Sequence, residues 1–209
     1  MSDPDAGVDR GRISGAIVAG GESTRFGGQP KGLCSVGGIR IIDRVRAALE
    51  SVVHDVALVA NAPDAGSWLP GIRAVHDQGT ERGSLVGLRT AVGHAEGPVI
   101  VVAWDMPFVS SELFSLLISR LMPGTGAVIP DGPRGPEPMC ALYTPSCLSA
   151  IDSALERRDL RLSSVVTQLP GAVRVGVSEV FAVGDPSRLF FNVNTPADLE
   201  LAGQMAHAA

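Results

Sequence analysis

Cysteine is scarce in this chain of 209 residues, which holds only Cys34, Cys140 and Cys147. Their number is odd and no pair has the C-x-x-C spacing, so we expect neither a disulfide framework nor a zinc site. Unpaired thiols are typical of a reducing compartment, which indicates a cytoplasmic protein. Aromatic residues are also few, at 4% of the chain, so aliphatic side chains are expected to supply most of the core.

Long apolar runs and an excess of positive charge are absent as well. No apolar run reaches the roughly 18 residues that a membrane-spanning helix needs, so we expect no membrane contact. The net charge of −5 argues against a general nucleic-acid surface. An acidic protein that binds polyphosphate has to gather its positive charge at one local site.

The length of the chain fits one medium-sized domain. Residues 1–12 are polar and contain no apolar signal segment. We therefore predict a short disordered leader over 1–12 and a single domain over 13–209.

Strand and helix patterns alternate along the chain, which predicts an α/β protein with a mostly parallel sheet. Strands are expected over 16–19, 55–60, 72–76, 98–103, 126–129, 139–143, 172–177 and 180–183. Helices are expected over 41–52, 84–94, 111–121, 145–157 and 160–169 and from 196 onward, with a proline-rich loop over 130–138. Ser84, Ser110 and Thr195 stand where helix N-caps are expected.

The most informative stretch is a glycine-rich loop that follows the strand 16–19. From Ala19 it reads A-G-G-E-S-T-R-F-G-G-Q-P-K. Glycine lets the backbone approach a ligand closely, and successive N–H groups in such a loop can form a nest for an anion. Arg25 and Lys31 add fixed positive charge. We therefore predict a polyphosphate-binding loop.

This loop is neither of the two common phosphate loops. A P-loop ends in Gly-Lys-Ser/Thr, whereas Lys31 follows Pro30, and no G-x-G-x-x-G is present. The missing dinucleotide fingerprint disfavours a Rossmann dehydrogenase.

Asp105 is the second candidate, because it ends the most apolar strand, 98–103. Ligands of open α/β sheets bind at the carboxyl ends of the strands. A carboxylate there suits Mg²⁺, which is held by one or two carboxylates together with phosphate oxygens and water. The alternative is an aspartate that belongs to a tight turn or caps the next helix.

Asn192 and Asn194 form the third candidate. On a strand their side chains would share one face. A neutral amide can complete a metal shell or contact a phosphate, and the alternative is that both amides satisfy backbone groups ahead of the helix at 196.

Together these motifs resemble the MobA-like family of nucleotidyltransferases. The resemblance rests on the glycine loop, on D-M-P at 105–107, on F-x-N-x-N-T-P-x-x-L at 190–199 and on the segments 77–88 and 137–143. It implies a three-layer α/β/α, Rossmann-like (GT-A-like) fold with a mostly parallel mixed sheet. In such a site Asp77 would accept from the N1–H and N2–H₂ edge of guanine. Asn61 would lie on the base or ribose side, or would be a turn residue.

The resemblance also implies roles for individual residues. Catalytic residues would be Arg25, Lys31 and Asp105. Metal ligands would be Asp105, Asn192 and Asn194. Nucleotide-binding residues would be Ala19, Gly20, Gly21, Ser23, Arg25, Lys31, Asn61, Asp77 and Asp105.

The implied activity is the Mg²⁺-dependent transfer of GMP from GTP to a phosphorylated acceptor, molybdopterin, with release of pyrophosphate. Other molybdenum cofactor biosynthesis proteins are possible partners. Pro30 departs from the family pattern, which usually has aspartate before the lysine, and Ser84 replaces a usual proline. Pro30 leaves open a cytidylyl- or other nucleotidyltransferase acting on molybdopterin or on a sugar or alcohol phosphate. A separate alternative is a non-catalytic nucleotide-binding accessory protein.

Overall fold

The computed structural model describes residues 13–20, 30–77 and 82–207. The predicted leader 1–12 and the predicted loop residues Gly21, Ser23 and Arg25 lie outside these ranges. None of the helices within the described ranges has the length and apolar character needed to cross a bilayer.

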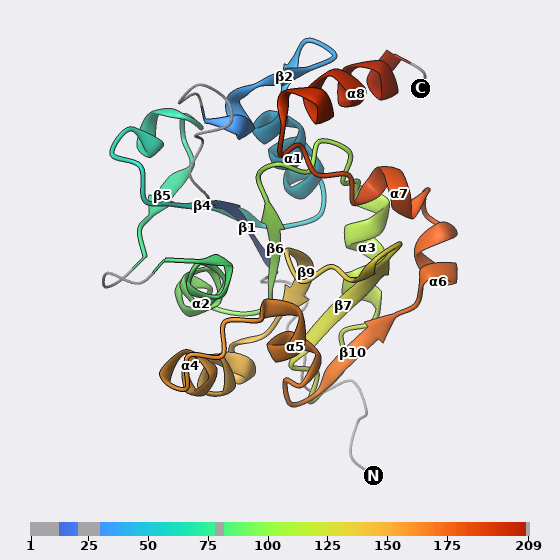
Figure 1. Ribbon diagram of the computed structural model, residues 1–209. Helices are drawn as coiled ribbons and strands as arrows, with labels where there is room; N and C mark the ends of the chain where they lie inside the picture. The colour runs from blue at the N-terminus through green and yellow to red at the C-terminus, as the bar shows by residue number, and fades with distance from the viewer. Residues whose placement is uncertain (1–12, 21–29, 78–81, 208–209) are drawn as a thin grey trace.

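A central mixed sheet organises the molecule (Figure 1). Its main path runs β10-β7-β9-β6-β1-β4-β5, and β8 pairs with β7 beside this path. The strands are β1 (Ser14–Ala19), β4 (Asp55–Ala60), β5 (Arg73–Val75), β6 (Val99–Ala103), β7 (Ala127–Gly132), β8 (Gly135–Pro136), β9 (Cys140–Tyr143) and β10 (Ala172–Val175). A separate small hairpin joins β2 (Ser35–Val36) to β3 (Ile39–Arg40).

The sheet is mostly parallel, as predicted. Strand β1 pairs in parallel with both β4 and β6, β4 with β5, and β10 with β7. Strand β9 runs antiparallel to both β6 and β7. The chain therefore goes from β1 outward to β4 and β5, and then returns to the other side of β1 as β6.

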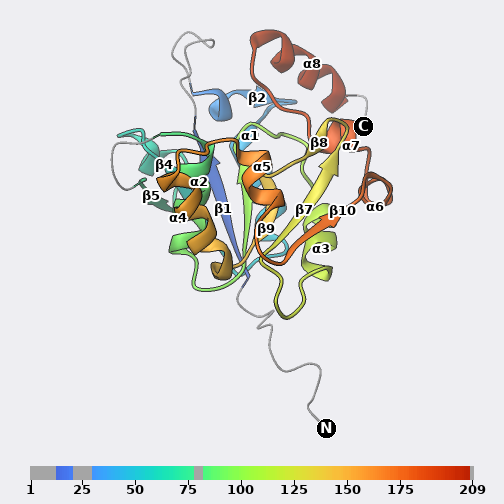
Figure 2. The ribbon, with the colours of Figure 1, turned by 60° about the horizontal axis from the view of Figure 1, so that its bottom comes forward.

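Helices cover both faces of this sheet. They are α1 (Ile41–Glu50), α2 (Ser84–His94), α3 (Ser111–Ser119), α4 (Leu148–Glu156), α5 (Leu162–Thr167), α6 (Val177–Phe181), α7 (Pro186–Leu189) and α8 (Pro196–His207). Figures 1 and 2 show α1 and α3 on one side of the sheet and α2, α4 and α5 on the other.

The pleat of β6 explains this three-layer arrangement. Its side chains alternate between two separate cores, Ile100 and Val102 facing one and Val99 and Val101 the other. All four are buried, which agrees with a strand covered on both faces. The predicted fold class is confirmed.

Helix ends follow local chemistry at two of the three predicted caps. The Ser110 hydroxyl accepts the Leu113 N–H at 3.3 Å, and the Thr195 hydroxyl accepts the Asp198 N–H at 3.2 Å. Ser84, in contrast, is the first residue of α2 and does not cap it. The N-cap is Gly83, whose φ of +142° favours glycine.

Two further predictions of local structure are wrong. Residues 130–138 are not a loop throughout, because β7 continues to Gly132 and pairs with β8 as a hairpin. Residues 180–183 form no strand, since Val180 belongs to α6 and fills the core with its side chain. Residues 191–194, which include both candidate asparagines, form an irregular segment.

Helix α8 closes one edge of the molecule against the β2–β3 hairpin (Figure 1). A small third core lies beneath it and includes Val36, Phe108 and Val193. The Arg188 guanidinium lies over the Phe108 ring, 4.4 Å from its centroid, and donates to the Met205 carbonyl at 2.8 Å. These contacts fix the segment 190–194, which leads back to the end of β6.

Candidate active site

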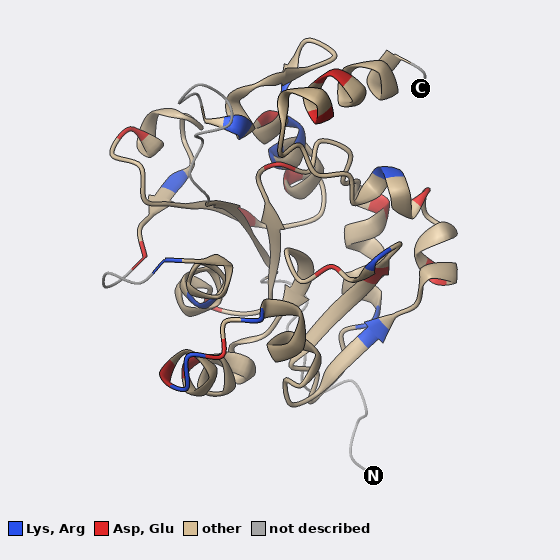
Figure 3. Ribbon diagram, in the orientation of Figure 1, with Lys and Arg blue, Asp and Glu red and all other residues tan. Residues whose placement is uncertain are grey.

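A cavity of about 450 Å³ lies at the carboxyl ends of β1, β4 and β6. The chain changes direction between β1 and β6, and ligands of open α/β sheets bind at such a switch point. Strands β1 and β6 themselves carry no charged residue, and β6 is drawn without red or blue segments in Figure 3. The first charged residue after β6 in the sequence is Asp105. Eight predicted site residues line this cavity: Ala19, Gly20, Lys31, Asn61, Asp77, Asp105, Asn192 and Asn194.

Lys31 forms the centre of the site. Its ammonium donates to the Asp105 carboxylate and, at 3.0 Å, to the Asn194 amide oxygen. The side chains of Lys31 and Asp105 are 17% and 9% exposed, so this ion pair is largely removed from water. A charge left alone in such a place is costly. The three predicted residues therefore hold one another in place.

Lys31 is also the only lysine of the 209-residue sequence. It begins a short 3-10 turn, Lys31–Leu33, in which Pro30 occupies the N-cap position with φ −62° and ψ 119°. The Pro30 carbonyl accepts the Leu33 N–H at 3.0 Å. Proline fixes φ near the value that this position has, so it sets the start of the turn that carries the lysine.

Asp105 keeps one oxygen without a hydrogen-bond partner in the described part of the chain. This buried Oδ1 is the second oxygen of the carboxylate that Lys31 contacts. The Asp105 backbone oxygen accepts the Val193 N–H at 2.9 Å, which joins the asparagine segment to the end of β6. A buried carboxylate oxygen that lacks a partner inside the protein is suited to a ligand.

These groups fit a divalent oxygen-seeking cation. Among the described residues, no three His, Cys, Asp or Glu side chains gather as a metal cluster. The cavity instead offers the Asp105 carboxylate and the amides of Asn192 and Asn194. Mg²⁺ takes few protein ligands and completes its shell with phosphate oxygens and water, so this sparse donor set suits it.

Asn192 both bonds to the backbone and faces the cavity, the two alternatives that the sequence left open. Its amide N–H donates to the Phe190 carbonyl at 2.9 Å, which satisfies the backbone ahead of α8. The residue nevertheless lines the cavity together with Asn194. The two amides reach the same site even though the segment is irregular.

Asn61 and Asp77 form a reciprocal pair on the far wall of the cavity. The Asn61 amide donates to Asp77 Oδ2 at 2.7 Å, and the Asp77 backbone N–H donates to Asn61 Oδ1 at 2.9 Å. The hydroxyl of buried Thr90 donates to Asp77 Oδ1 at 2.7 Å. Each carboxylate oxygen has a second lone pair, so Asp77 keeps capacity to accept from a ligand.

Trp104 is a site residue that the sequence reasoning missed. It lines the cavity, and its ring stacks on Trp68 with centroids 5.1 Å apart and planes 17° apart. A Cβ added to Gly32 would lie 2.4 Å from Trp104 Cε3, so only glycine lets the lysine turn pack on this ring. The contact pair Gly32–Trp104 thus adjoins the pair Lys31–Asp105. The only sequence signal for Trp104 was its position next to Asp105.

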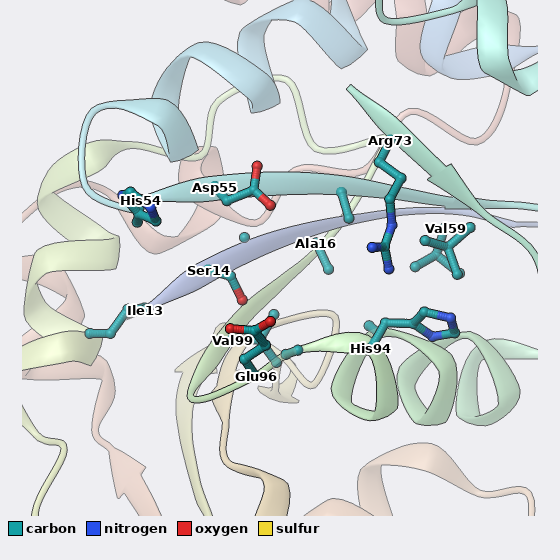
Figure 4. Close-up of a pocket in the computed structure, with 15 residues that line it drawn as sticks. Ile13, Ser14, Ala16, His54, Asp55, Val59, Arg73, His94, Glu96 and Val99 are labelled. Atoms are coloured by element: carbon teal, nitrogen blue, oxygen red, sulfur yellow. The ribbon is translucent and has the colours of Figure 1, made fainter. Parts of the chain in front are cut away.

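A second cavity, of about 510 Å³, lies at the opposite, amino-terminal ends of β1 and β4. Figure 4 shows Arg73 and His94 at one end of it and Asp55 and Glu96 nearer Ser14. His94 Nδ1 lies 3.0 Å from the Thr90 carbonyl and therefore carries the proton. None of the predicted site residues lines this cavity.

The cysteines are structural. All three are buried, and none of them forms a disulfide. Burial raises the pKa of Cys34 and Cys140, and it raises the pKa of Cys147 to about 11. These thiols are protonated at neutral pH and are poor nucleophiles.

Comparison with known proteins identifies relatives over nearly the whole chain. The family model described as the MobA-like NTP transferase domain matches residues 15–189. The molybdenum cofactor guanylyltransferase of Desulfosudis oleivorans is 33% identical over 91% of this chain and 94% of its own length. The probable molybdenum cofactor guanylyltransferase of Pelotomaculum thermopropionicum is 36% identical over 93% and 94%.

A solved structure agrees with this relationship. The molybdopterin-guanine dinucleotide biosynthesis protein A from Archaeoglobus fulgidus superposes with a TM-score of 0.78 at 25% identity, covering 94% of this chain and 100% of that one. The chain therefore belongs to the MobA-like NTP transferase family of nucleotidyltransferases.

Proposed function

We propose that this protein transfers GMP from GTP to molybdopterin and releases pyrophosphate, with Mg²⁺ as the metal. The names of the relatives support the reaction. The observation that carries it in this chain is the position of its single lysine between Asp105 and Asn194, at the carboxyl ends of the central strands.

GTP would bind with its phosphates near Lys31 and its base near the Asn61–Asp77 pair. The glycine loop that begins at Gly20 would surround the phosphates, and Arg25 would add a second positive charge. Guanine presents N1–H and N2–H₂ donors, and the Asp77 carboxylate is the matching acceptor on that wall.

Asp105 would hold the metal, with Asn192 or Asn194 as an amide ligand. Mg²⁺ would neutralise phosphate charge there. Lys31 would stabilise the negative charge of the α-phosphate as the acceptor phosphate attacks in line and pyrophosphate leaves. An acceptor phosphate is already ionised, so positioning and charge neutralisation suffice and no strong general base is required.

The structure gives Pro30 a role in the fold that does not depend on the acceptor, because it starts the turn that carries Lys31. We therefore keep molybdopterin as the acceptor. We also propose a cytoplasmic location, supported by the three unpaired thiols, and contact with other molybdenum cofactor biosynthesis proteins. That residues 13–209 form one domain, behind a leader of 1–12, stays a prediction.

The decisive experiment measures pyrophosphate release with each of the four nucleoside triphosphates, with Mg²⁺ and with either molybdopterin or simple sugar and alcohol phosphates. We expect release only with GTP and molybdopterin. Release with CTP or with a sugar phosphate would establish the alternative transferase. Tight GTP binding without release in a single-turnover assay would establish the accessory protein.

A further inference from the structure

A third cavity, of about 370 Å³, borders the candidate active site, and Asp77 does not line it. Asn192 and Asn194 line both spaces, so the two cavities meet beside Lys31. The remaining walls come from the hairpin between β7 and β9, from the segment 186–191 and from Asp198 of α8. An acceptor whose phosphate reaches Lys31 could therefore extend its other end into this third cavity.

Glu137 lines this cavity. Its backbone is held in place, because its N–H donates to the Pro130 carbonyl at 2.9 Å and its carbonyl accepts the Cys140 N–H at 3.0 Å. The carboxylate packs against Gly132, where an added Cβ would lie 2.4 Å from Oε1. Glycine at 132 thus leaves the space that the carboxylate occupies.

No hydrogen bond reaches this carboxylate from any described residue. Glu137 is partly buried, and burial raises its pKa while the charge of nearby Arg134 opposes that rise. Removing a carboxylate from water without giving it a hydrogen bond is unfavourable, so the group gains from a ligand that donates to it.

The other carboxylate of this cavity is already engaged. Asp198 accepts the backbone N–H groups of Asn194 and Thr195 at 3.0 and 2.8 Å. Burial alone would raise the pKa of Asp198, but these hydrogen bonds outweigh it and lower the pKa. Glu137 is thus the carboxylate available to a ligand, and Phe190 and Phe191 provide aromatic wall beside it.

We propose that Glu137 recognises the heterocyclic head of the acceptor, a flat ring that presents an N–H beside an amino group. This inference rests on the proposed function, because the pterin ring of molybdopterin carries the same donor edge as guanine. The protein would then use one carboxylate for each of two ligand rings that present the same pair of donors, a ring N–H beside an amino group. Asp77 would accept from the guanine of GTP in the nucleotide cavity, and Glu137 would accept from the acceptor in the third cavity.

The test compares Glu137→Gln with the matched variant Glu156→Gln, which removes an exposed carboxylate at the end of α4. The probe is 6-methylpterin, a fluorescent pterin without phosphate or hydroxyl, titrated while saturating GTP and Mg²⁺ fill the nucleotide cavity. We expect Glu137→Gln to weaken probe binding about tenfold or more. Glutamine lacks the negative charge, and its amide N–H₂ would face one of the N–H donors of the pterin.

Steady-state kinetics provide the second readout. Glu137→Gln is expected to raise the KM for molybdopterin and leave the KM for GTP unchanged, whereas Asp77→Asn raises the KM for GTP alone. Equal probe binding by wild type and Glu137→Gln, or no probe binding by wild type, would overturn the inference. Probe binding that depends on Glu137 without any GMP transfer would overturn the proposed function and leave only the recognition of a pterin ring by Glu137.

Discussion

At the scale of single residues, the site is a set of side chains that depend on one another across the sequence. Lys31 and Asp105 are 74 positions apart, and each supplies the countercharge that the other needs in a largely buried place. Both residues could be predicted from the sequence, because each stands in a motif at the end of a strand. Their direct contact is a property of the folded sheet, and no local pattern predicts it.

Replacing Lys31 with alanine tests the central role. We expect kcat to fall about 10²- to 10³-fold, since the variant loses a positive charge aimed at the reacting phosphate. Pyrophosphate release at saturating GTP and acceptor measures the effect. Arg46→Ala is the control, because Arg46 lies in an exposed pair with Glu50 on α1. A kcat within threefold of wild type in Lys31→Ala would exclude the assignment.

Gly32→Ala tests whether Trp104 positions the lysine. The added methyl group would meet the Trp104 ring at 2.4 Å, and such overpacking costs about 1–3 kcal/mol. We expect a lower Tm and a reduced kcat, because the turn that carries Lys31 has to move. Gly66→Ala provides the matched control, since a Cβ there meets nothing within 4 Å. Equal Tm and kcat in the two variants would show that the ring does not position the turn.

At the scale of elements, the helices and strands that could be predicted from the sequence are those with an unambiguous hydrophobic pattern. Strands β4 and β6 and helix α3 follow from clear periodicity and a serine cap. The short apolar run at 180–183 was misread, because a run of this length suits a buried helix as well as a strand. Glu179 stabilises the start of this helix, because its carboxylate accepts the N–H of the N-cap residue Gly176 at 3.0 Å. The hairpin over 130–138 was missed because its prolines and glycines are typical of a loop.

The N-terminus of α8 gives a prediction at this scale. Asp198 accepts two backbone N–H groups there, so Asp198→Ala is expected to lower the free energy of unfolding by about 1 kcal/mol at neutral pH. Urea unfolding of both proteins measures the difference. Glu200→Ala, which removes an exposed carboxylate of the same helix, is the control and should change stability by only a few tenths of a kcal/mol.

The same pair of proteins should show a defined pH dependence. The pKa of Asp198 is lowered in the folded state. Its contribution to stability is therefore complete above the ordinary carboxyl pKa of about 3.9 and is lost as the pH falls through the lower folded value. The difference between wild type and Asp198→Ala should persist at pH 5 and vanish in strong acid. A difference that stays constant across this range would contradict the hydrogen-bonded cap.

At the scale of the whole molecule, one edge of the sheet carries all the chemistry proposed here. The carboxyl ends of β1, β4 and β6 supply the nucleotide cavity, and the chain's return from α7 to α8 brings in the asparagines and the third cavity. The mostly parallel sheet and the edge at which ligands bind could be predicted from the alternating pattern, whereas the order of the strands was not predicted. The third cavity could not be predicted, because it depends on a hairpin and an irregular segment that meet only in the fold.

The stacked pair Trp68–Trp104 has an optical consequence. The sequence holds two tryptophans, and both lie in this stack beside Lys31 and Asp105. All indole emission of the protein therefore originates in a stack of two rings, one of which, Trp104, lines the nucleotide cavity. Titration with GTP and Mg²⁺ should change the intensity or wavelength of that emission in a saturable way, and Trp68→Phe should keep the response while Trp104→Phe diminishes it. Stopped-flow measurement of tryptophan fluorescence would then follow the occupancy of the nucleotide cavity by GTP without an added label.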